Sequence, residues 1–370
     1  MSALKRIKVD NFRNLKNVDL DLRPEVNLFI GDNGSGKTSF MEAIHVLSVG
    51  KSFRTARVDP LLAEGKDQFL IYAELFSGDR IGLQRDLSTT PNLRLNSEPQ
   101  SGWKEVAPLM PIQVLNSDSF LLIDGGAGVK RRFIDWAMFH VEHSYLGRWR
   151  NYRRLVQQRN ALLKLSPRDI QSQLTIWDEE LAKSGEEMHL HRKQLLKSYI
   201  PVLLKTINEF LPAIDISIDY KKGWPRGMSL HHALFDSRAK DTKYRATTLG
   251  PHRADVAITS AGLPVSEVLS RGQIKLVACA LKISMSRYLS QIKADQGNPA
   301  YTITFLVDDL ASELDANSSG AVLDALITSK NQCIFTAITS GDLARVSDLT
   351  ETSGKFHVEH GKIQAVKPAV

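Results

Sequence analysis

The order of apolar and polar positions divides the chain into two strand-rich regions with a long helical region between them. Apolar residues alternate with polar ones over residues 4–9 and 18–22, which is the period of half-buried strands, and 26–30 is an apolar strand. From Thr38 the apolar positions recur at helical spacing until Gly50, a residue type that often ends helices. The start of the chain is therefore predicted to run strand, glycine loop, helix.

The pattern changes near Asp118, where long helical segments begin. Residues 131–140 and 145–165 are predicted helices, and 174–211 is predicted to form one or two more, with Pro201 and Pro212 as breaks. Strand patterns return afterwards. They cover 214–218 and 254–259, and after a helix at 273–289 the apolar runs 303–307 and 334–338 have the composition of a buried parallel sheet.

Composition narrows the class of protein without identifying it. The chain has 370 residues, of which 42% are hydrophobic and 24% charged, as expected for a globular protein with a large core. Cys279 and Cys333 lie in segments predicted to be buried, which favours packing in a reducing cytosol over a disulfide or a metal site. We find no stretch apolar enough for a signal peptide or a membrane span and expect a cytoplasmic protein. A net charge of +7 is compatible with a polyanionic partner, although charge alone is a weak argument.

An eight-residue glycine loop joins the first apolar strand to the helix after it. It matches the phosphate-binding pattern G-x-x-x-x-G-K-[ST] in the context that this pattern requires. Its backbone N–H groups and the helix N-terminus would bind ATP phosphates, Lys37 would reach the β- and γ-phosphates, and the Thr38 hydroxyl would coordinate Mg²⁺. A glycine-rich turn that binds nothing is the alternative. The residues are Gly31, Asp32, Asn33, Gly34, Ser35, Gly36, Lys37 and Thr38.

Two carboxylates end the apolar strand near residue 305. In a Walker B element, Asp308 would hold Mg²⁺ through water and Asp309 would act as general base toward the attacking water. Paired acids after a strand are common in solvated loops, so this pattern gains weight only from its position in the chain.

The segment Leu269-Ser270-Arg271-Gly272-Gln273 resembles the ABC signature L-S-G-G-Q and is followed by an apolar-periodic helix. Ser270 can cap that helix, whose free N–H groups would then be available to an anion. In ABC ATPases this surface binds the γ-phosphate held by the opposite subunit, whereas a plain capped helix is the alternative. Residues 311–315, which include Ser312 and Asp315, look like the D-loop that contacts the partner subunit.

Two features predict slow hydrolysis. Asp309 stands where a longer glutamate is usual, and a shorter acid reaches its water less well. The strand 334–338 leads into Thr339 and Ser340, where many ABC ATPases carry a histidine that this chain lacks. Slow turnover is what a molecular switch requires.

Taken together, these motifs resemble the RecF family, the bacterial recombination mediators of the SMC-like branch of ABC ATPases. The signature variant with Arg271 is itself usual in that family. The matching segments span nearly the whole chain in the family's order: residues 10–14, 31–38, 52–54, 125–126, 131–136, 250–255, 269–276 and 308–315.

The resemblance implies an α/β fold: an ABC-type ATPase head with a mixed sheet and flanking helices, plus a helical lid. The corresponding division is 1–117 and 213–370 for the head and 118–212 for the lid. It further implies an ATP-dependent homodimer with Mg²⁺ as the metal, and a preference for double-strand to single-strand DNA junctions at gaps. Partners would be RecR and RecO, which act with it to load RecA and so serve the SOS response.

Basic residues supply the candidates for DNA contact. The predicted helix from residue 145 carries no acid but six cations, namely Arg148, Arg150, Arg153, Arg154, Arg159 and Lys164. Six like charges repel one another unless a polyanion or neighbouring acids compensate them. Lys130, Arg131 and Arg132 begin the preceding helix, and Arg54 follows the phosphate-loop helix. A solvated basic face, or for Arg54 a simple salt bridge, is the alternative.

Two other functional classes compete with an ATP-gated DNA clamp. An ABC ATPase subunit of a transporter would be a shorter cassette, with its signature much closer to the second motif. A nuclease-linked ATPase would need a further cluster of carboxylates with metal-ligand spacing, which we do not find in the sequence. The clamp is therefore the favoured hypothesis.

Overall fold

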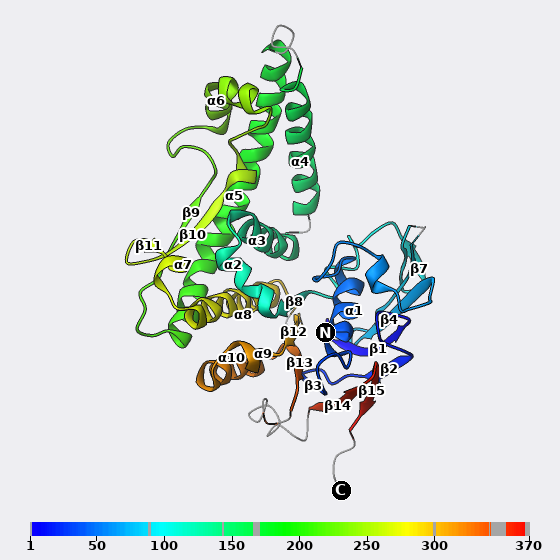
Figure 1. Ribbon diagram of the computed structural model, residues 1–370. Coiled ribbons are helices and arrows are strands. Elements are labelled where there is room, and N and C mark those ends of the chain that lie inside the picture. Colours follow the sequence, from blue (N-terminus) through cyan, green and yellow to red (C-terminus); the bar gives the residue numbers. More distant parts are fainter. Residues whose placement is uncertain are drawn as a thin grey trace. The chain divides into compact units, whose positions relative to one another are not determined.

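A computed structural model of the chain describes residues 2–87, 90–142, 144–165, 171–298, 301–339, 341 and 353–366. The chain forms two units (Figure 1). The sheet unit comprises Met1–Ser119 and Ser290–Val370, and the helical unit comprises Phe120–Leu289.

The sheet unit begins with a six-stranded antiparallel sheet. Lys8 of the first strand pairs with Asp19 on one side and with Tyr72 on the other, so residues far apart in the sequence share a face. The strand order is β2 (Val18–Asp21), β1 (Leu4–Asp10), β4 (Gln68–Leu75), β5 (Arg80–Asp86), β6 (Asn92–Leu95) and β7 (Glu98–Gln100).

A second six-stranded sheet carries the parallel strands that the apolar runs predicted. Its order is β15 (Lys362–Ala365), β14 (Gly354–Glu359), β3 (Val26–Ile30), β13 (Gln332–Ala337), β12 (Thr304–Asp308) and β8 (Ile112–Leu115). All neighbours are parallel except β14 and β15. Parallel strands buried on both faces read as continuous apolar runs, and β13 is buried at every position.

One helix fills the space between the two sheets. Helix α1 (Lys37–Val49) shares a single core with strands of both sheets, and its Phe40 ring lies 4.6 Å from that of Phe29 on β3. The ring of Phe356, the residue paired with Phe29 on the neighbouring β14, also stacks on Phe29 at 4.6 Å. The short α9 (Leu310–Glu313) and then α10 (Ala316–Thr328) follow β12. The glycine loop before α1 is therefore held between a buried strand and a buried helix.

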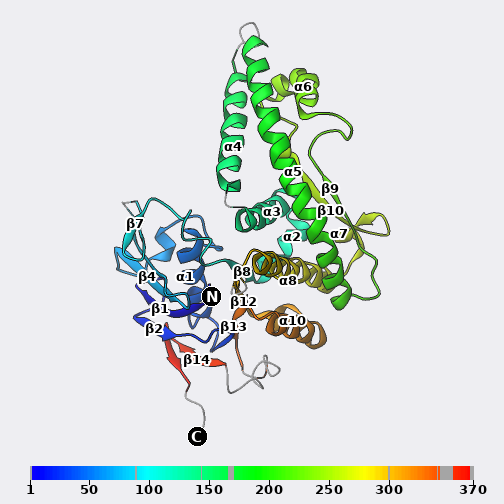
Figure 2. The same cartoon turned by 180° about the vertical axis from the view of Figure 1, so that it is seen from behind.

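Long helices dominate the helical unit, and Figures 1 and 2 both show α4 running beside α5. Pro201 lies inside α5 and does not end it, so the break predicted at this proline is wrong and the segment is a single helix. The helices are α2 (Leu121–Asp124), α3 (Ala127–Val141), α4 (Tyr145–Leu162), α5 (Gln171–Phe210), α6 (Leu230–Tyr244), α7 (Val265–Val268) and α8 (Arg271–Asp295), whose last turn extends into the sheet unit.

The helical unit also contains a small antiparallel sheet, in the order β11 (Leu263–Pro264), β10 (Asp255–Ser260) and β9 (Ser217–Lys221). Ile218 and Ile258 of this sheet pack against Phe133 of α3 and Leu196 of α5. This packing groups residues 213–289 with the helices, so the boundary at 212 expected from the resemblance is not the structural one. The signature segment consequently lies in the helical unit.

In the described part of the chain, no helix is long and apolar enough to span a bilayer. Cys279 and Cys333 are both buried and free, as predicted, and burial raises the pKa of the Cys279 thiol to about 12.

Candidate functional site

The glycine loop lies between β3 and α1, as the sequence predicted. Gly34 and Gly36 have φ angles of 78° and 121°, in the region that favours glycine. At Gly31 a Cβ atom would lie 2.1 Å from the carbonyl oxygen of Val358, so only glycine allows β14 to pass this close. The loop is thus fixed in a conformation that leads directly into the N-terminus of α1, where backbone N–H groups can receive phosphate oxygens.

Lys37 lies folded against the loop. Its Nζ donates to the carbonyl oxygens of Gly31, at 2.5 Å, and of Asp32, at 2.9 Å. Burial lowers the pKa of the Lys37 ammonium, and the nearby carboxylates of Asp308, Asp309 and Asp32 oppose that shift. A buried cation whose direct partners are two neutral carbonyls is well placed to exchange them for an anion.

Oxygen ligands suited to a divalent cation meet beside Lys37. The Thr38 hydroxyl donates to Asp308 Oδ2 at 2.9 Å, which joins the start of α1 to the end of β12. The Thr336 hydroxyl donates to Asp308 Oδ1 at 2.6 Å and accepts the Asp309 N–H at 3.1 Å. A hydroxyl and a carboxylate next to a phosphate loop are the donor set that Mg²⁺ takes, so these residues fit a magnesium ion.

Asp309 follows with a left-handed backbone, at φ 50°, which the Ser312 hydroxyl supports by donating to the Asp309 carbonyl oxygen at 2.8 Å. Asp309 and Ser312 line a cavity of about 450 Å³ in the sheet unit. The other lining residues are Asn33, Gly34, Gly36, Lys37, Thr38, Ser39, Phe53, Arg54, Asn116, Ser117, Asp118, Asp308 and Glu313. Most predicted nucleotide-site residues of this unit therefore surround one polar cavity.

A buried acid that the sequence analysis missed organises the back of this cavity. Glu42 of α1 is fully buried and accepts hydrogen bonds from both the Arg13 guanidinium and the Ser52 hydroxyl. Arg54 Nη1 lies 3.6 Å from the same carboxylate, yet its side chain is 46% exposed and lines the cavity. Arg54 thus makes the ion pair that was the alternative interpretation and still presents its cation to the cavity. The available sequence signal was an acid within an apolar helical face.

Asn14 and Gly361 also support the loop, and neither was predicted. The Asn14 side-chain amide donates to the Gly34 carbonyl oxygen at 3.1 Å, and the Gly361 N–H donates to that of Ser35 at 2.8 Å. A Cβ atom on Gly361 would lie 1.8 Å from the Asn14 carbonyl oxygen. Asn14 is 20 residues from Gly34, and Gly361 is separated from Ser35 by most of the chain, so no local pattern could predict these contacts.

The signature segment forms a reciprocal cap at the start of α8. The Gln273 side chain accepts the Ser270 N–H at 2.9 Å, and Ser270 Oγ accepts the Gln273 N–H at 3.3 Å. Ser270, Arg271 and Gly272 are exposed. The predicted cap is therefore present, on a surface of the helical unit that is open to a ligand.

Asp315, predicted as a dimer contact, is the N-cap of α10 and accepts the N–H groups of Asn317 and Ser318 at 3.1 and 3.0 Å. A hydrogen bond from the Ser318 side chain, together with these backbone bonds, holds the pKa of the Asp315 carboxyl below its usual value. Because Asp315 is exposed, capping does not prevent it from contacting a partner.

Two of the predicted DNA contacts are engaged inside the helical unit. Lys130 Nζ forms an ion pair with Asp255 at 3.0 Å, and Arg131 donates to the Ala254 carbonyl oxygen at 2.6 Å. Both residues fix the start of β10 to α3, and their contact with DNA stays a prediction. Arg132 remains exposed.

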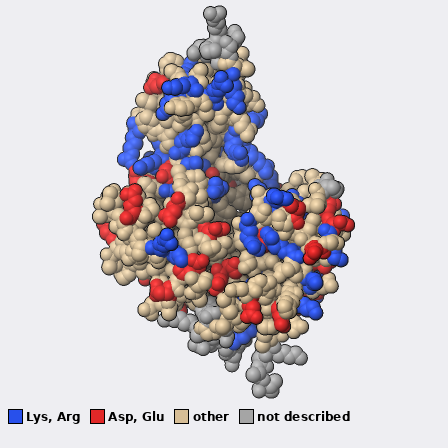
Figure 3. All heavy atoms as spheres, in the orientation of Figure 1, with Lys and Arg blue, Asp and Glu red and all other residues tan. Residues whose placement is uncertain are grey.

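Exposed cations also line α4. Arg153 lies over the Trp149 ring at 4.7 Å, and Arg154 donates to the side chain of Asn151 at 3.2 Å. Arg148 is partly exposed, with Glu187 3.5 Å away. Among the charged side chains on the upper part of the helical unit in Figure 3, blue, basic ones outnumber red, acidic ones. The exposed cations of α4 thus form a basic helix surface.

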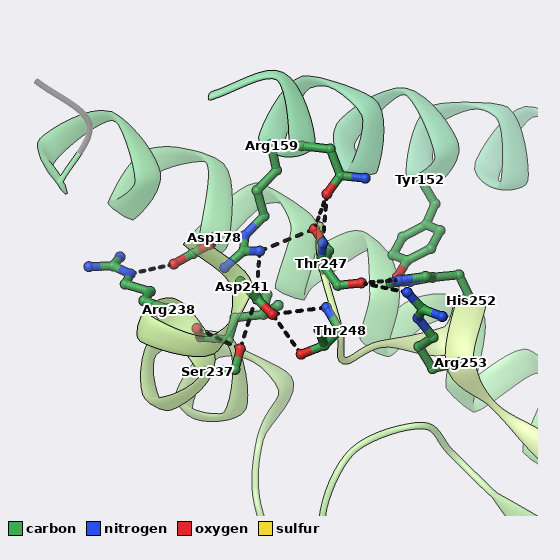
Figure 4. Close-up of polar contacts among 12 residues, drawn as sticks. Tyr152, Arg159, Asp178, Ser237, Arg238, Asp241, Thr247, Thr248, His252 and Arg253 are labelled. Carbon is green, nitrogen blue, oxygen red and sulfur yellow. Dashed lines mark hydrogen bonds and ion pairs between the residues drawn. The ribbon is translucent and has the colours of Figure 1, made fainter. Parts of the chain in front are cut away.

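Arg159 was predicted for that basic surface, but it is fully buried (Figure 4). Its guanidinium donates to Asp178 at 2.6 Å, to Asp241 at 2.7 Å and to the Thr247 hydroxyl at 3.1 Å. Both carboxylates are also fully buried. We call these four residues the Arg159 cluster. The cluster joins α4 to α5, α6 and the loop after α6. Pairing with the two carboxylates explains why the Arg159 cation is buried.

A second bond ties α4 to the residue 250–253 segment. The Tyr152 hydroxyl lies 2.6 Å from His252 Nδ1, and His252 Nε2 lies 3.0 Å from the Thr247 carbonyl oxygen (Figure 4). Since a carbonyl only accepts, Nε2 carries the proton and Nδ1 accepts from tyrosine. Burial lowers the pKa of His252 to about 4, which keeps the ring neutral.

The fold and the cavity define a class. A phosphate loop between a parallel strand and a helix, facing a carboxylate at the end of a neighbouring strand, is the nucleotide site of the P-loop proteins. The family model described as "RecF/RecN/SMC N terminal domain" matches residues 3–364. The head of an Smc protein bound to a winged-helix domain of ScpA shares the fold, with a TM-score of 0.58 at 13% identity over 98% of this chain and 97% of that one.

Full-length relatives narrow the class to one family. The DNA replication and repair protein RecF of Cellvibrio japonicus is 36% identical over 98% of this chain and 99% of its own length. That of Coxiella burnetii is 35% identical over 99% and 100%. A solved structure of the recombination mediator protein RecF with ATP, in the RecFOR pathway, superimposes with a TM-score of 0.83 at 26% identity, covering 99% of this chain and 98% of that one. The chain belongs to the RecF family of DNA replication and repair proteins, within the SMC-like class of ABC ATPases.

Proposed function

We propose that the chain is an ATP-gated DNA-binding protein that dimerises on ATP. The closed dimer grips DNA at double-strand to single-strand junctions beside gaps. In recombinational repair, replication restart and the SOS response it then acts with RecO and RecR to promote loading of RecA.

ATP phosphates are received by residues 31–38. Lys37 leaves its two carbonyl partners for the β- and γ-phosphate oxygens, which restores a full charge partner to a buried ammonium. Thr38 and Asp308 hold Mg²⁺, which neutralises charge on the phosphates. Asp309 orients the attacking water, and its short side chain makes hydrolysis slow, as a switch requires.

The observation that carries dimerisation is the division of the nucleotide motifs between the two units. The phosphate loop and both carboxylates belong to the sheet unit, whereas the exposed signature cap belongs to the helical unit. A γ-phosphate bound by one chain can therefore accept hydrogen bonds from the signature N–H groups of a second chain. Ser312, which lines the cavity, and the exposed Asp315 would contact that partner. Two chains would sandwich two ATP molecules.

DNA would bind first the exposed cations other than Lys130, which pairs with Asp255, and Arg131, which donates to the Ala254 carbonyl oxygen. These are Arg132, Arg148, Arg153 and Arg154 in the helical unit, with Arg54 at the nucleotide cavity. Phosphate contacts of this kind bind without sequence preference and weaken as salt rises.

The relatives support the cellular role. They are DNA replication and repair proteins, and the solved relative is a recombination mediator in the RecFOR pathway. We infer from this that RecO, RecR and RecA act with this chain in the cytoplasm. No observation favours a nuclease or transporter subunit, and the described residues contain no His, Cys, Asp and Glu group that could hold a nuclease metal.

The test is the solution mass of the full chain with ATP and Mg²⁺, and with ADP and Mg²⁺, each with and without gapped DNA. ATP should shift monomer to dimer and strengthen DNA binding. Lys37→Met should abolish both effects, while Asp309→Asn should trap the ATP dimer because its water is no longer activated. A mass and DNA affinity that ignore the nucleotide would refute the proposal.

A further inference from the structure

A groove at the free edge of the small sheet has no role in the proposed function. It has a volume of about 790 Å³ and lies wholly in the helical unit. The lining residues come from α5, from β9 and from the turn that follows β9: His189, Lys193, Asp219, Tyr220, Lys221, Lys222, Gly223, Trp224, Arg226 and Gly227.

Strand β9 ends its sheet. It pairs with β10 from Ser217 to Lys221, and among the described residues no strand pairs with its other edge. A strand bonded on one side leaves the N–H and C=O of every second residue directed outward. The residues of β9 alternate between exposed and half-buried, so none of them is fully buried, and Asp219, Tyr220 and Lys221 line the groove.

The floor of the groove is preformed. The His189 ring stacks on Tyr220 at 5.6 Å and meets Trp224 edge-on at 5.2 Å. Lys222 Nζ lies 4.6 Å from the centre of the Trp224 ring and donates to the Met228 carbonyl oxygen at 2.9 Å. Gly223 has φ 98°, and a Cβ there would lie 2.2 Å from the Gly250 carbonyl oxygen. The turn is therefore locked, and a ligand would not have to order it.

Charge in the groove is positive. Arg226 and Asp219 form an exposed ion pair at 2.8 Å and cancel each other. Lys193 and Lys221 are exposed and make no ion pair or hydrogen bond with the described residues. Two uncompensated cations thus line the groove, one on α5 and one at the end of β9.

We propose that β9 accepts an extended acidic segment of a partner protein as an additional strand. Main-chain hydrogen bonds to the outer edge of β9 hold the segment, and its carboxylates face Lys193 and Lys221. The five residues of β9 match a segment about 17 Å long. A nucleic acid strand would use the two charges but could not use the strand edge, which is why the edge favours a peptide. The inference goes beyond the proposed function and depends on neither ATP nor DNA.

The probe is a fluorescein-labelled ten-residue peptide in which glutamate alternates with valine or threonine. Its fluorescence anisotropy is followed as the full chain is added. A peptide with lysine in place of glutamate and a ten-nucleotide oligo-dT serve as comparison ligands. The acidic peptide should bind, and the lysine peptide should not.

Charge reversal tests where the peptide binds. Lys193→Glu with Lys221→Glu should weaken binding of the acidic peptide about tenfold, because two surface charge pairs become repulsive. The matched control is Lys183→Glu with Lys205→Glu, two exposed positions elsewhere on α5 that change the net charge equally. Equal affinity of the two variants would overturn the proposal.

N-methylation of the peptide tests how it binds. Methylating alternate residues removes the N–H donors along one edge of the peptide and leaves its charge unchanged. Two peptides are compared, one methylated at the odd-numbered residues and the other at the even-numbered residues. Strand addition predicts that one of these peptides loses binding while the other retains it. Equal binding of the two methylated peptides, or oligo-dT that binds the groove as well as the peptide does, would contradict strand addition and identify a simple polyanion surface.

Discussion

The nucleotide cavity of the sheet unit and the Arg159 cluster of the helical unit are both built from buried charge, but the charge is satisfied differently. The Lys37 ammonium donates hydrogen bonds to two backbone carbonyls, and carboxylates lie near it without bonding to it directly. Arg159 holds two fully buried carboxylates directly, and Asp178 also accepts from Arg238 at 2.8 Å. The cavity keeps its cation available to an anion, whereas the cluster has permanent partners.

This difference separates function from stability. Removing a buried charge that has permanent partners leaves those partners uncompensated, so the fold becomes less stable. Removing a charge whose partners are exchangeable costs the fold little and costs ligand binding more. The following changes test that division, from the largest expected effect to the smallest.

Arg159→Met should have the largest effect on stability. Methionine fills most of the side-chain volume but leaves the carboxylates of Asp178 and Asp241 without their main partner, at a cost of about 3–5 kcal/mol. Urea denaturation followed by circular dichroism measures the loss. The control is Arg154→Met, an exposed arginine on the same helix, which should change stability by about 0.5 kcal/mol or less. Similar losses in both variants would show that the cluster is not a special site.

Lys37→Met should have the opposite profile. ATP affinity should fall about thirtyfold, or about 2 kcal/mol, because charge-assisted bonds to the phosphates are lost. Stability should change by about 1 kcal/mol or less, since the ammonium is desolvated and bonded only to neutral carbonyls. Binding of a fluorescent ATP analogue and urea denaturation measure the two quantities on one preparation. A large loss of stability with intact ATP binding would reverse the comparison.

His252 should make stability depend on pH. Its pKa is lowered from 6.5 to about 4, so between these values the unfolded chain takes up a proton that the folded chain refuses. The contribution of the neutral His252 ring to the free energy of unfolding is complete above pH 6.5 and is lost as the pH falls toward 4. The loss amounts to about 2 kcal/mol by pH 5.

His252→Gln removes the titrating group while its amide can still accept from Tyr152 and donate to Thr247. Urea denaturation at pH 7 and pH 5 should show about 2 kcal/mol less acid sensitivity in this variant than in the parent chain. The exposed His231→Gln should leave that sensitivity as it is in the parent. Identical acid sensitivity in the parent and His252→Gln would contradict the buried neutral imidazole.

Thr336→Val should have the smallest effect. Valine keeps the shape but removes the hydroxyl that donates to Asp308 and accepts the Asp309 N–H, at about 1 kcal/mol of stability. Because Asp308 loses its support, ATP binding should require a few-fold more Mg²⁺. Magnesium titrations of ATP binding in the variant and the parent check this, and superimposable curves would show that Thr336 only packs.

The fold and the motifs of the nucleotide cavity could be predicted because they are local. Glycines, a lysine and a threonine in a fixed order between a strand and a helix indicate a phosphate-binding loop. Asp308 follows an apolar run that is long enough to form a buried strand. Thr336, Glu42 and Gly361 could not be predicted. A threonine in a buried strand and a glycine in a turn have no distinctive pattern, and an acid within an apolar helical face marks Glu42 without identifying its partners.

The basic residues also show that contacts between distant segments cannot be predicted from local sequence. The sequence analysis grouped Arg159 with the exposed arginines of α4, because a run of charged residues does not reveal which side chain is buried in the core. Asp178 and Asp241, which decide its direction, lie on other helices. The partners of Lys130 and Arg131 could not be predicted for the same reason, since Asp255 and the Ala254 carbonyl become neighbours only in the folded chain.

The central claim is that a complete nucleotide site needs the phosphate loop of one chain and the signature cap of another. The most direct test mixes two defective chains, Lys37→Met and Ser270→Arg, and measures mass and ATP hydrolysis with ATP and Mg²⁺. Each alone should stay monomeric and inactive. Together they should form a dimer with one intact site, because ATP on the Ser270→Arg chain can use the signature of the Lys37→Met chain. A mixture as monomeric and inactive as its components would contradict the account.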